Sequence, residues 1–113
     1  MSDSEEILSI LNDEISRKII KKITGDELTI QQISTFLDIP QSTAYRKIRK
    51  LEEMGLIKKT KVVRNEDGSD ESYYKSWIYQ IGVTFKNGEL SYSVEKFKME
   101  DKIVRLWEKF SNK

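Results

Sequence analysis

Residues 37–57 read LDIPQSTAYRKIRKLEEMGLI and contain the most informative helical pattern of the chain. Ala44, Ile48 and Leu51 recur at the spacing of successive helical turns, which predicts a helix over about 41–54 with these three side chains buried. At about 100° per residue, the side of that helix opposite Ala44 is polar and basic. It carries Ser42, Arg46, Arg49 and Lys50, with Thr43 and Tyr45 at its edges.

The segment before this helix predicts a shorter helix joined to it by a tight turn. Thr29 and Gln32 have the spacing of a capping box. In this motif the threonine hydroxyl accepts the backbone N–H of the glutamine, and the glutamine side chain accepts the backbone N–H of the threonine. Pro40 separates the two helices, because proline is tolerated at the start of a helix but interrupts its interior. The sequence therefore predicts two helices with only residues 38–40 between them.

Residues 5–23 carry isoleucine and leucine at spacings of three and four, which is typical of one apolar stripe along a helix. Asn12 or Asp13 could cap a second helix inside this span. One long helix and two shorter helices both remain open.

Two strands are predicted after the basic helix. Residues 57–64 are basic and β-branched, residues 72–81 are rich in aromatic side chains, and the acidic loop 65–71 joins them. We expect these strands to form an antiparallel ribbon.

A second hairpin is predicted over 83–94, because Asn87-Gly88 is a preferred two-residue turn of type I′. Folding about this turn matches charge with opposite charge, apolar with apolar and hydroxyl with hydroxyl. The expected pairs are Lys86 with Glu89, Phe85 with Leu90, Thr84 with Ser91 and Val83 with Tyr92. We expect core packing for Trp77, Tyr79, Phe85 and Tyr92.

The end of the chain predicts an amphipathic helix over about 99–110. Its apolar stripe includes the large side chains Ile103, Leu106, Trp107 and Phe110. We expect this stripe to form a dimer interface, although packing within one subunit is the alternative. Residues 98–113 are therefore set apart from a main domain that covers 1–97.

The 113 residues include no Cys and no His, so disulfides, thiolate or imidazole metal sites and cysteine nucleophiles are excluded. We expect neither an enzyme nor a bound metal or cofactor. No apolar run approaches the about 20 residues that span a membrane, and the acidic start MSDSEE is unlike an export signal. We therefore expect a cytoplasmic protein.

Charge is distributed unevenly along the chain. The formal net charge is only +1, but residues 41–64 hold eight basic side chains against two acidic ones. A polyanion responds to this local field rather than to the net charge. The element order predicts an α+β winged helix-turn-helix with an additional β-hairpin and a C-terminal helix. Such a fold suits double-stranded DNA, because the major groove admits one α-helix and a basic ribbon can lie near the backbone.

The block over 37–57 resembles the recognition-helix region of ArsR-type and MarR-type winged-helix transcriptional regulators, particularly small archaeal ones. The most specific features are the Ser42-Thr43 start and the LEEMGLI ending at 51–57. The resemblance covers about residues 12–80 and implies a homodimer that binds an inverted-repeat operator. It places Gln41, Ser42, Thr43, Tyr45 and Arg46 in the groove, Arg49 and Lys50 on bases or phosphates, and Lys59, Lys61 and Arg64 on the wing.

The chain differs from the family pattern in two respects, which concern metal sensing and the wing tip. Metal sensing by Cys and His is not carried over, and no effector is predicted. The wing tip is acidic at 65–71, so phosphate would repel it, and the tip either stays off the DNA or binds something else. A winged-helix module for protein interactions within the transcription machinery is therefore the alternative function.

For some of these site residues, a purely structural role is the alternative to DNA binding. Tyr45 could pack on the neighbouring helix, and the lysines of 57–64 could protect a strand edge from aggregation.

Overall fold

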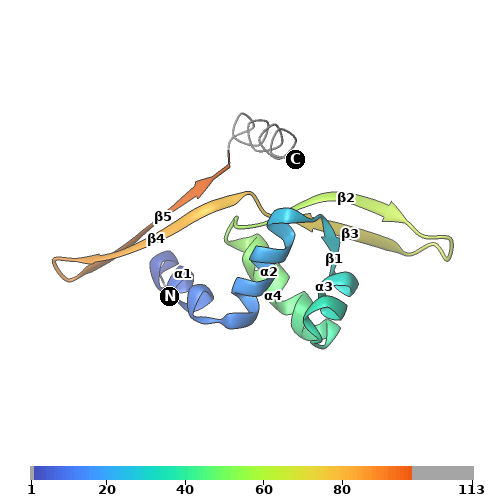
Figure 1. Cartoon of the computed structure of the whole chain (residues 1–113), viewed down its shortest axis with the longest axis horizontal. Helices are drawn as coiled ribbons and strands as arrows, with labels where there is room; N and C mark the ends of the chain where they lie inside the picture. The colour runs from blue at the N-terminus through green and yellow to red at the C-terminus, as the bar shows by residue number, and fades with distance from the viewer. Residues whose placement is uncertain (1, 98–113) are drawn as a thin grey trace, which may run out of the picture.

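The computed structural model describes residues 2–97. Its helices are α1 (Asp3–Asn12), α2 (Glu14–Gly25), α3 (Ile30–Leu37) and α4 (Gln41–Glu53). Its strands are β1 (Leu28–Thr29), β2 (Lys58–Arg64), β3 (Asp70–Lys75), β4 (Ile78–Lys86) and β5 (Glu89–Lys96). The four helices form a bundle, and the hairpins β2–β3 and β4–β5 extend from it in opposite directions (Figure 1). The helix predicted over 99–110, with its dimer residues, lies outside the described residues.

The N-terminal segment forms two helices, which resolves the alternatives left open by the sequence. Asp13 separates α1 from α2 and caps α2, since its Oδ2 accepts the backbone N–H of Ser16 at 3.1 Å and the Ser16 hydroxyl at 2.6 Å. The two helices bury Ile7, Ile10, Ile19 and Ile23 against the rest of the bundle.

The helix-turn-helix forms as its local sequence predicts. The capping box is present, with Gln32 N–H donating to Thr29 Oγ1 at 3.1 Å and Thr29 N–H donating to Gln32 Oε1 at 2.9 Å. Three residues, 38–40, connect α3 to α4. Asp38 takes a left-handed conformation with φ of 54°, which turns the chain sharply at the end of α3.

The far end of α4 is closed by Gly55, whose φ of 73° suits the left-handed position after a helix. Leu56 N–H donates to the Leu51 carbonyl and Gly55 N–H donates to the Glu52 carbonyl, both at 3.0 Å. This pair of hydrogen bonds is a Schellman motif, and it returns Leu56 and Ile57 to the core.

The core lies between the helices and the base of the sheet. Ala44, Ile48 and Leu51 of α4 are at most 1% exposed, as their spacing predicts. They join the apolar residues of the other elements in one cluster, which comprises Ile7, Ile10, Ile19, Ile23, Leu28, Ile33, Leu56, Ile57 and Tyr74. The opposite side of α4 is thereby left at the surface.

The wing is the antiparallel pair β2–β3, as predicted, and the sheet has the order β1-β3-β2. The two-residue strand β1 was not predicted. It pairs Leu28 with Tyr74 and Thr29 with Tyr73, which ties the start of α3 to the wing. The arrangement as a whole is a winged helix-turn-helix of the α+β class, with an additional hairpin.

The single strand predicted over 72–81 is wrong, because the chain leaves the wing at Ser76 and enters a second sheet. Ser76 is 1% exposed, and its N–H donates to the Ile23 carbonyl at 3.1 Å. Its hydroxyl donates to the Leu56 carbonyl at 3.1 Å and accepts the N–H of Ile78 at 3.3 Å. Since these bonds satisfy Ser76 outside any β ladder, they separate β3 from β4.

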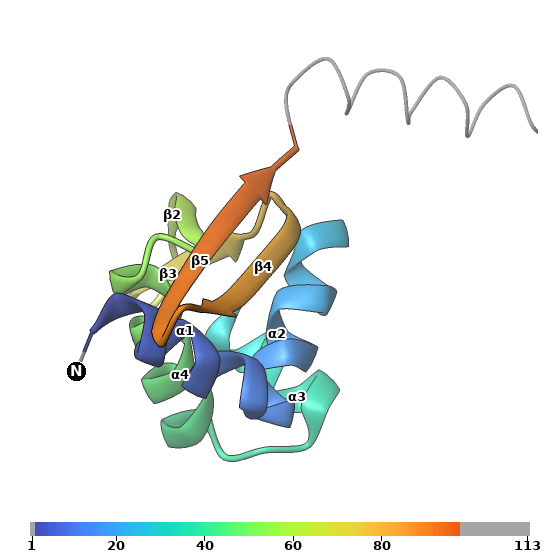
Figure 2. The same ribbon diagram turned by 90° about the vertical axis from the view of Figure 1, so that its left-hand side faces the viewer.

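The β4–β5 hairpin has the predicted register in all four pairs around the turn. Asn87 and Gly88 have φ of 52° and 77°, as a type I′ turn requires. The hairpin is longer than predicted, and its base packs on the core through Ile78, Ile81, Val83 and Val94. Figure 2 shows β5 passing beside α1.

The expectation that the aromatic residues of this region fill the core is wrong for three of them. Tyr79 is 58% exposed, Phe85 is 74% exposed and Tyr92 is 36% exposed among the described residues. Phe85 lies near the tip of the hairpin, which extends beyond the helices (Figure 1), whereas Tyr79 lies at the base, within the register shift between Ile78 and Gln80. Trp77, at the base, is half-buried.

Candidate nucleic-acid interface

The N-terminal end of α4 presents backbone N–H groups without a side-chain acceptor from its cap. Ser2, Asp13 and Thr29 cap the other three helices with a side-chain oxygen, whereas Pro40 at the start of α4 has none. The first N–H groups of a helix have no partner inside the helix and carry partial positive charge. This end of α4 is therefore chemically suited to an anion such as a phosphate.

The ridge of α4 that points straight away from the core carries Ser42 and Arg46. With Ala44 at zero, they lie at about 160° and 200°. Both side chains are exposed. Within residues 2–97 the Arg46 guanidinium forms no ion pair, so it is available to an external anion.

One flank of α4 faces the wing. It carries Gln41, Tyr45 and Arg49, at about 60°, 100° and 140° on the same scale. Together with Lys59 of β2, these residues line a groove of about 770 Å³, which we call the wing groove. Tyr45 is 52% exposed and therefore accessible from the groove.

Arg49 is held on two sides by neighbours one turn away. Its Nε donates to Glu53 Oε1 at 3.4 Å and its Nη1 donates to Tyr45 Oη at 3.5 Å. The hydrogen bond with Tyr45 and then the one with Glu53 raise the pKa of Arg49 above its ordinary value. Arg49 therefore stays charged, and its Nη2 atom takes part in neither of these two hydrogen bonds.

The other flank of α4 faces the corner between α1 and α2. It carries Lys50 and Lys47, at about 240° and 300°. Lys50 Nζ lies 2.5 Å from Glu6 Oε1 of α1, and Lys47 Nζ lies 2.8 Å from Asp13 Oδ2. Of the predicted site residues on α4, Lys50 is thus the one that pairs with another helix.

Thr43 lies on the same flank and is half-buried. Six of the seven predicted residues of α4 are therefore exposed at the surface, while Thr43 is only partly so.

The wing cations differ in how they are paired. Lys59 is exposed and lines the wing groove without an ion pair among the described residues. Lys61 Nζ lies 3.9 Å from Glu27 Oε2 and 4.6 Å from the centre of the Tyr73 ring, and Arg64 Nε lies 3.3 Å from Asp70 Oδ1. A register shift lies between Lys59 and Lys61, where the Thr60 hydroxyl bonds to Glu27.

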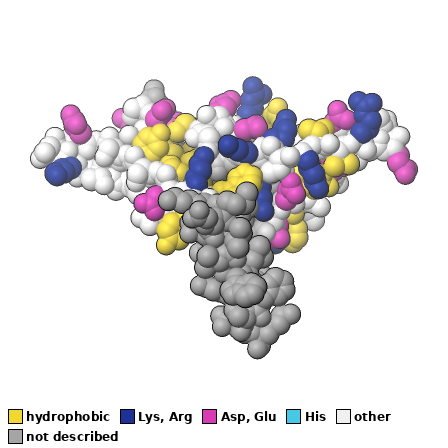
Figure 3. Space-filling view, turned by 90° about the horizontal axis from the view of Figure 1, so that it is seen from above, with side chains coloured by type: hydrophobic (Ala, Val, Ile, Leu, Met, Phe, Trp, Pro, Cys, Tyr) yellow, Lys and Arg dark blue, Asp and Glu magenta, His cyan; other side chains and the backbone are white. Residues whose placement is uncertain are grey.

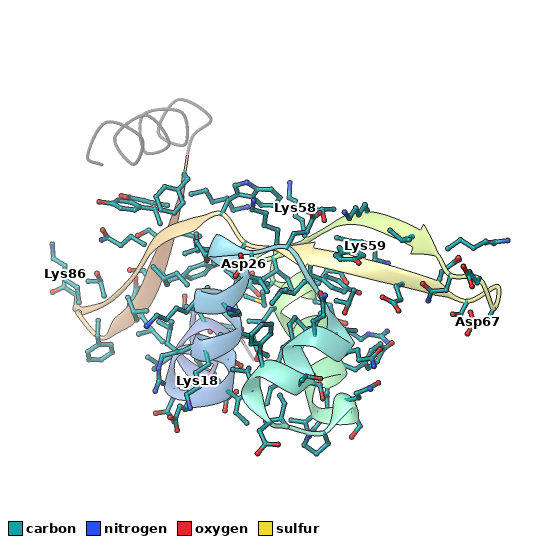
Figure 4. All side chains as sticks on the ribbon, turned by 45° about the vertical axis from the view of Figure 1, so that its right-hand side comes forward. Lys18, Asp26, Lys58, Lys59, Asp67 and Lys86 are labelled. Atoms are coloured by element: carbon teal, nitrogen blue, oxygen red, sulfur yellow. The ribbon has the colours of Figure 1, made fainter. Side chains whose placement is uncertain are left out.

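The tip of the wing is acidic and compact. Asp67 Oδ1 accepts the N–H of Ser69 at 2.9 Å and its hydroxyl at 2.6 Å, and these bonds lower the pKa of Asp67 below its ordinary value. Figure 4 shows Asp67 at the tip and Lys58 and Lys59 near the base of the wing. Positive charge available to a polyanion thus lies at the base of the wing.

Acidic side chains also surround the wing groove. Its carboxylates are Glu52, Glu53, Asp70 and Glu71. They outnumber the two cations that line it, Arg49 and Lys59. On the face formed by the strands, Figure 3 shows basic and acidic side chains interspersed rather than gathered in one patch. A phosphate backbone would therefore be favoured along the ridge of α4 and the rim of the groove rather than deep inside it.

Metal ions and membranes impose requirements that can be compared with residues 2–97. Within residues 2–97, no three Asp or Glu side chains are grouped so that they could hold a metal ion. In the same part of the chain, none of the helices has the length and apolar character needed to cross a membrane.

Sequence patterns did not identify the acidic side chains that pair with lysines of α4 and the wing. Glu6, Asp13 and Glu27 lie far along the chain from the lysines that they pair with, and no spacing rule connects them. Glu53 was detectable, because it follows Arg49 by one helical turn, the spacing of a stabilising ion pair.

Comparison with known proteins finds a domain family that is similar to part of the chain. Residues 10–60 match the profile of a family described as a helix-turn-helix domain. The match covers α2, α3 and α4 and ends within β2. It therefore falls on the helices that form the helix-turn-helix of the structure.

Curated relatives are archaeal. The chain is 32% identical over 97 residues to "HTH-type transcriptional regulator FL11" of Pyrococcus horikoshii, a match that covers 85% of this chain and 62% of the relative. It is 40% identical over 55 residues to uncharacterized HTH-type transcriptional regulators of Pyrococcus horikoshii and Pyrococcus abyssi, covering 48% of this chain and 34% of each. The chain thus spans less than two thirds of the length of these relatives.

A solved structure supports the fold. HlyU from Vibrio cholerae superposes with a TM-score of 0.53 at 14% identity, covering 98% of this chain and 94% of that chain. At this level of identity, the likeness concerns the fold alone.

Proposed function

We propose that this chain, which carries a helix-turn-helix domain in a winged-helix fold, is a sequence-specific DNA-binding regulator of transcription. In this proposal α4 enters the major groove and the base of the β2–β3 wing lies near the backbone. The observation that carries the proposal is the position of Arg46. It lies on the side of α4 opposite the buried Ala44, Ile48 and Leu51, exposed and without an ion pair among residues 2–97.

The remaining residues take their roles from their positions. Ser42 and Arg46, on the outermost ridge of α4, read base edges. Gln41, Thr43 and Tyr45, on the two flanks of that ridge, also contact the DNA. Arg49, Lys59, Lys61 and Arg64 supply charge toward bases or phosphates. Lys61 and Arg64 would exchange a carboxylate partner for a phosphate, so we expect smaller contributions from them than from Lys59.

We further propose that the protein belongs to the ArsR-type or MarR-type regulators and acts in the cytoplasm as a homodimer on an inverted repeat. The segment 98–113 forms the dimer contact through Ile103, Leu106, Trp107 and Phe110. The archaeal transcriptional regulators that the chain resembles support a regulatory role. No metal, cofactor, membrane or catalytic step enters this function.

The test is a salt titration against duplex DNA. The logarithm of the affinity should fall with the logarithm of salt concentration, with a slope of about −0.9 for each phosphate contact. Selection of bound sequences from a random duplex pool should then yield one operator with a dyad. Failure to bind any duplex at low salt would overturn the proposal.

The second candidate function is a protein-interaction module of the transcription machinery. The specific observation in its favour is the excess of carboxylates around the wing groove and at the wing tip, which repels phosphate and suits a basic protein segment. Binding of a basic protein partner at salt concentrations that abolish DNA binding would favour this alternative.

A further inference from the structure

Lys50 of α4 is paired with α1 rather than directed to an external ligand. Its Nζ lies 2.5 Å from Glu6 Oε1, where the Glu6 side chain is 19% exposed and the Lys50 side chain is 46% exposed. The carboxylate is thus largely enclosed, while the ammonium group borders solvent.

A neighbouring contact fixes the same flank of α4 more firmly. Lys47 Nζ lies 2.8 Å from Asp13 Oδ2, both side chains are 29% exposed, and Asp13 is anchored as the cap of α2. Lys47 lies closer to the core side of the helix than Lys50 does, at about 300° against about 240°. The Lys47 pair therefore holds the helices together, and the Lys50 pair is the exchangeable one.

We propose that Glu6 masks Lys50 from DNA and thereby lowers the affinity of the recognition helix. This inference rests on the proposed function. A cation strengthens DNA binding by replacing the counterions of a phosphate, and a lysine already neutralised by a carboxylate cannot do so without breaking its ion pair.

Replacing Glu6 with glutamine tests the proposal, because the amide keeps the size of the side chain and removes its charge. In the full chain, Glu6→Gln should bind a random-sequence duplex about three- to eightfold more tightly at 0.1 M salt, as expected for one added phosphate contact. The log–log slope against salt should become steeper by about 0.9. A purely structural role for the pair predicts the opposite sign, weaker binding.

Matched variants separate release of Lys50 from the change in overall charge. Glu14→Gln removes the same charge from an exposed carboxylate of α2 that pairs with Lys18 at 3.1 Å, and it should leave the slope unchanged. Lys50→Gln alone leaves the Glu6 carboxylate unpaired beside the DNA, so it should weaken binding, but by less than Arg46→Ala does, since Lys50 makes no phosphate contact in the wild type. The double variant Glu6→Gln with Lys50→Gln should return to the wild-type slope.

Three results would overturn the masking role: no gain in Glu6→Gln beyond that of Glu14→Gln, a gain that persists in the double variant, or a loss in Lys50→Gln as large as that in Arg46→Ala. The last comparison decides the question even where Glu6→Gln does not fold. Wild-type protein that binds no duplex at low salt overturns the proposed function instead, so the two failures are distinguishable.

Discussion

Arg46 is the residue on which the proposed DNA binding depends most directly. Its side chain is exposed opposite the core and unpaired among the described residues. Arg46→Ala should weaken binding to the selected operator by about 1–3 kcal/mol, the loss expected for one base-reading arginine. Fluorescence anisotropy with a labelled duplex measures this loss. Lys18→Ala removes the same charge from the exposed surface of α2 and serves as the control; equal losses in both variants would remove the role of Arg46.

Asp13 combines two functions at the corner between α1 and α2, because it caps α2 and pairs with Lys47. Asp13→Ala should lower the free energy of unfolding by about 1–2 kcal/mol, the usual effect of losing a helix cap. Asp13→Asn keeps a capping side chain and loses the charge, so we expect a smaller effect. Thermal and urea unfolding of the three proteins at neutral pH provide the measurement.

The pH dependence of this contribution has a definite sign. The hydrogen bond from Lys47, followed by the one from Ser16, lowers the pKa of the Asp13 carboxyl below its ordinary value of 3.8. A carboxyl with a lowered pKa stabilises the folded protein above its unfolded value, and the contribution is lost as pH falls through the folded value. The stability difference between wild type and Asp13→Asn should therefore be largest above pH 3.8 and shrink on further acidification. A difference that grows below this pH would contradict the assignment.

At the scale of elements, α4 depends on the turn that ends it. Gly55 has a φ of 73°, a conformation that costs an L-residue about 1–2 kcal/mol, so Gly55→Ala should destabilise the protein by about that amount. Gly25, the last residue of α2, has neither a positive φ nor an atom within 4 Å of an added Cβ. Gly25→Ala should be neutral or stabilising by up to about 1 kcal/mol. Urea unfolding checks both, and similar losses in the two variants would contradict the role of the Schellman motif.

The elements differ in how well the sequence predicted them. The Asn87-Gly88 hairpin formed in the predicted register, because turn chemistry and cross-strand pairing act between near neighbours. The strand predicted over 72–81 is divided, since the hydrogen bonds of Ser76 reach Ile23 and Leu56, which are distant in the chain. Strand β1 is too short to leave a pattern of its own.

For the molecule as a whole, the proposed homodimer makes a prediction about its DNA site. A dimer with two copies of α4 should protect two half-sites whose centres lie about 10–10.5 base pairs apart, or a multiple of that spacing. Light scattering should give twice the 13.3 kDa mass of the chain. A monomer in solution, together with a footprint lacking a dyad, would overturn the dimer while leaving the function of α4 open.

The structure also leaves exposed two aromatic side chains that the sequence assigned to the core. Phe85 is exposed near the tip of the β4–β5 hairpin, and Tyr79 is exposed at its base, within the register shift between Ile78 and Gln80. Alternation along a strand identifies one face as apolar, but it carries no information on how much of that face a neighbouring element covers. The extent of the core therefore depended on the packing of the hairpin against α1.

The amino-acid order alone was enough to establish the two helices around Pro40, the buried side of α4, the capping box and the second hairpin. Each of these depends on residues within about two helical turns or directly across a tight turn, so spacing encodes it. The ion pairs of Lys47, Lys50 and Lys61 emerged only once the chain had folded. They join segments far apart in the sequence, where proximity follows from packing, and they determine which cations of the candidate interface remain free.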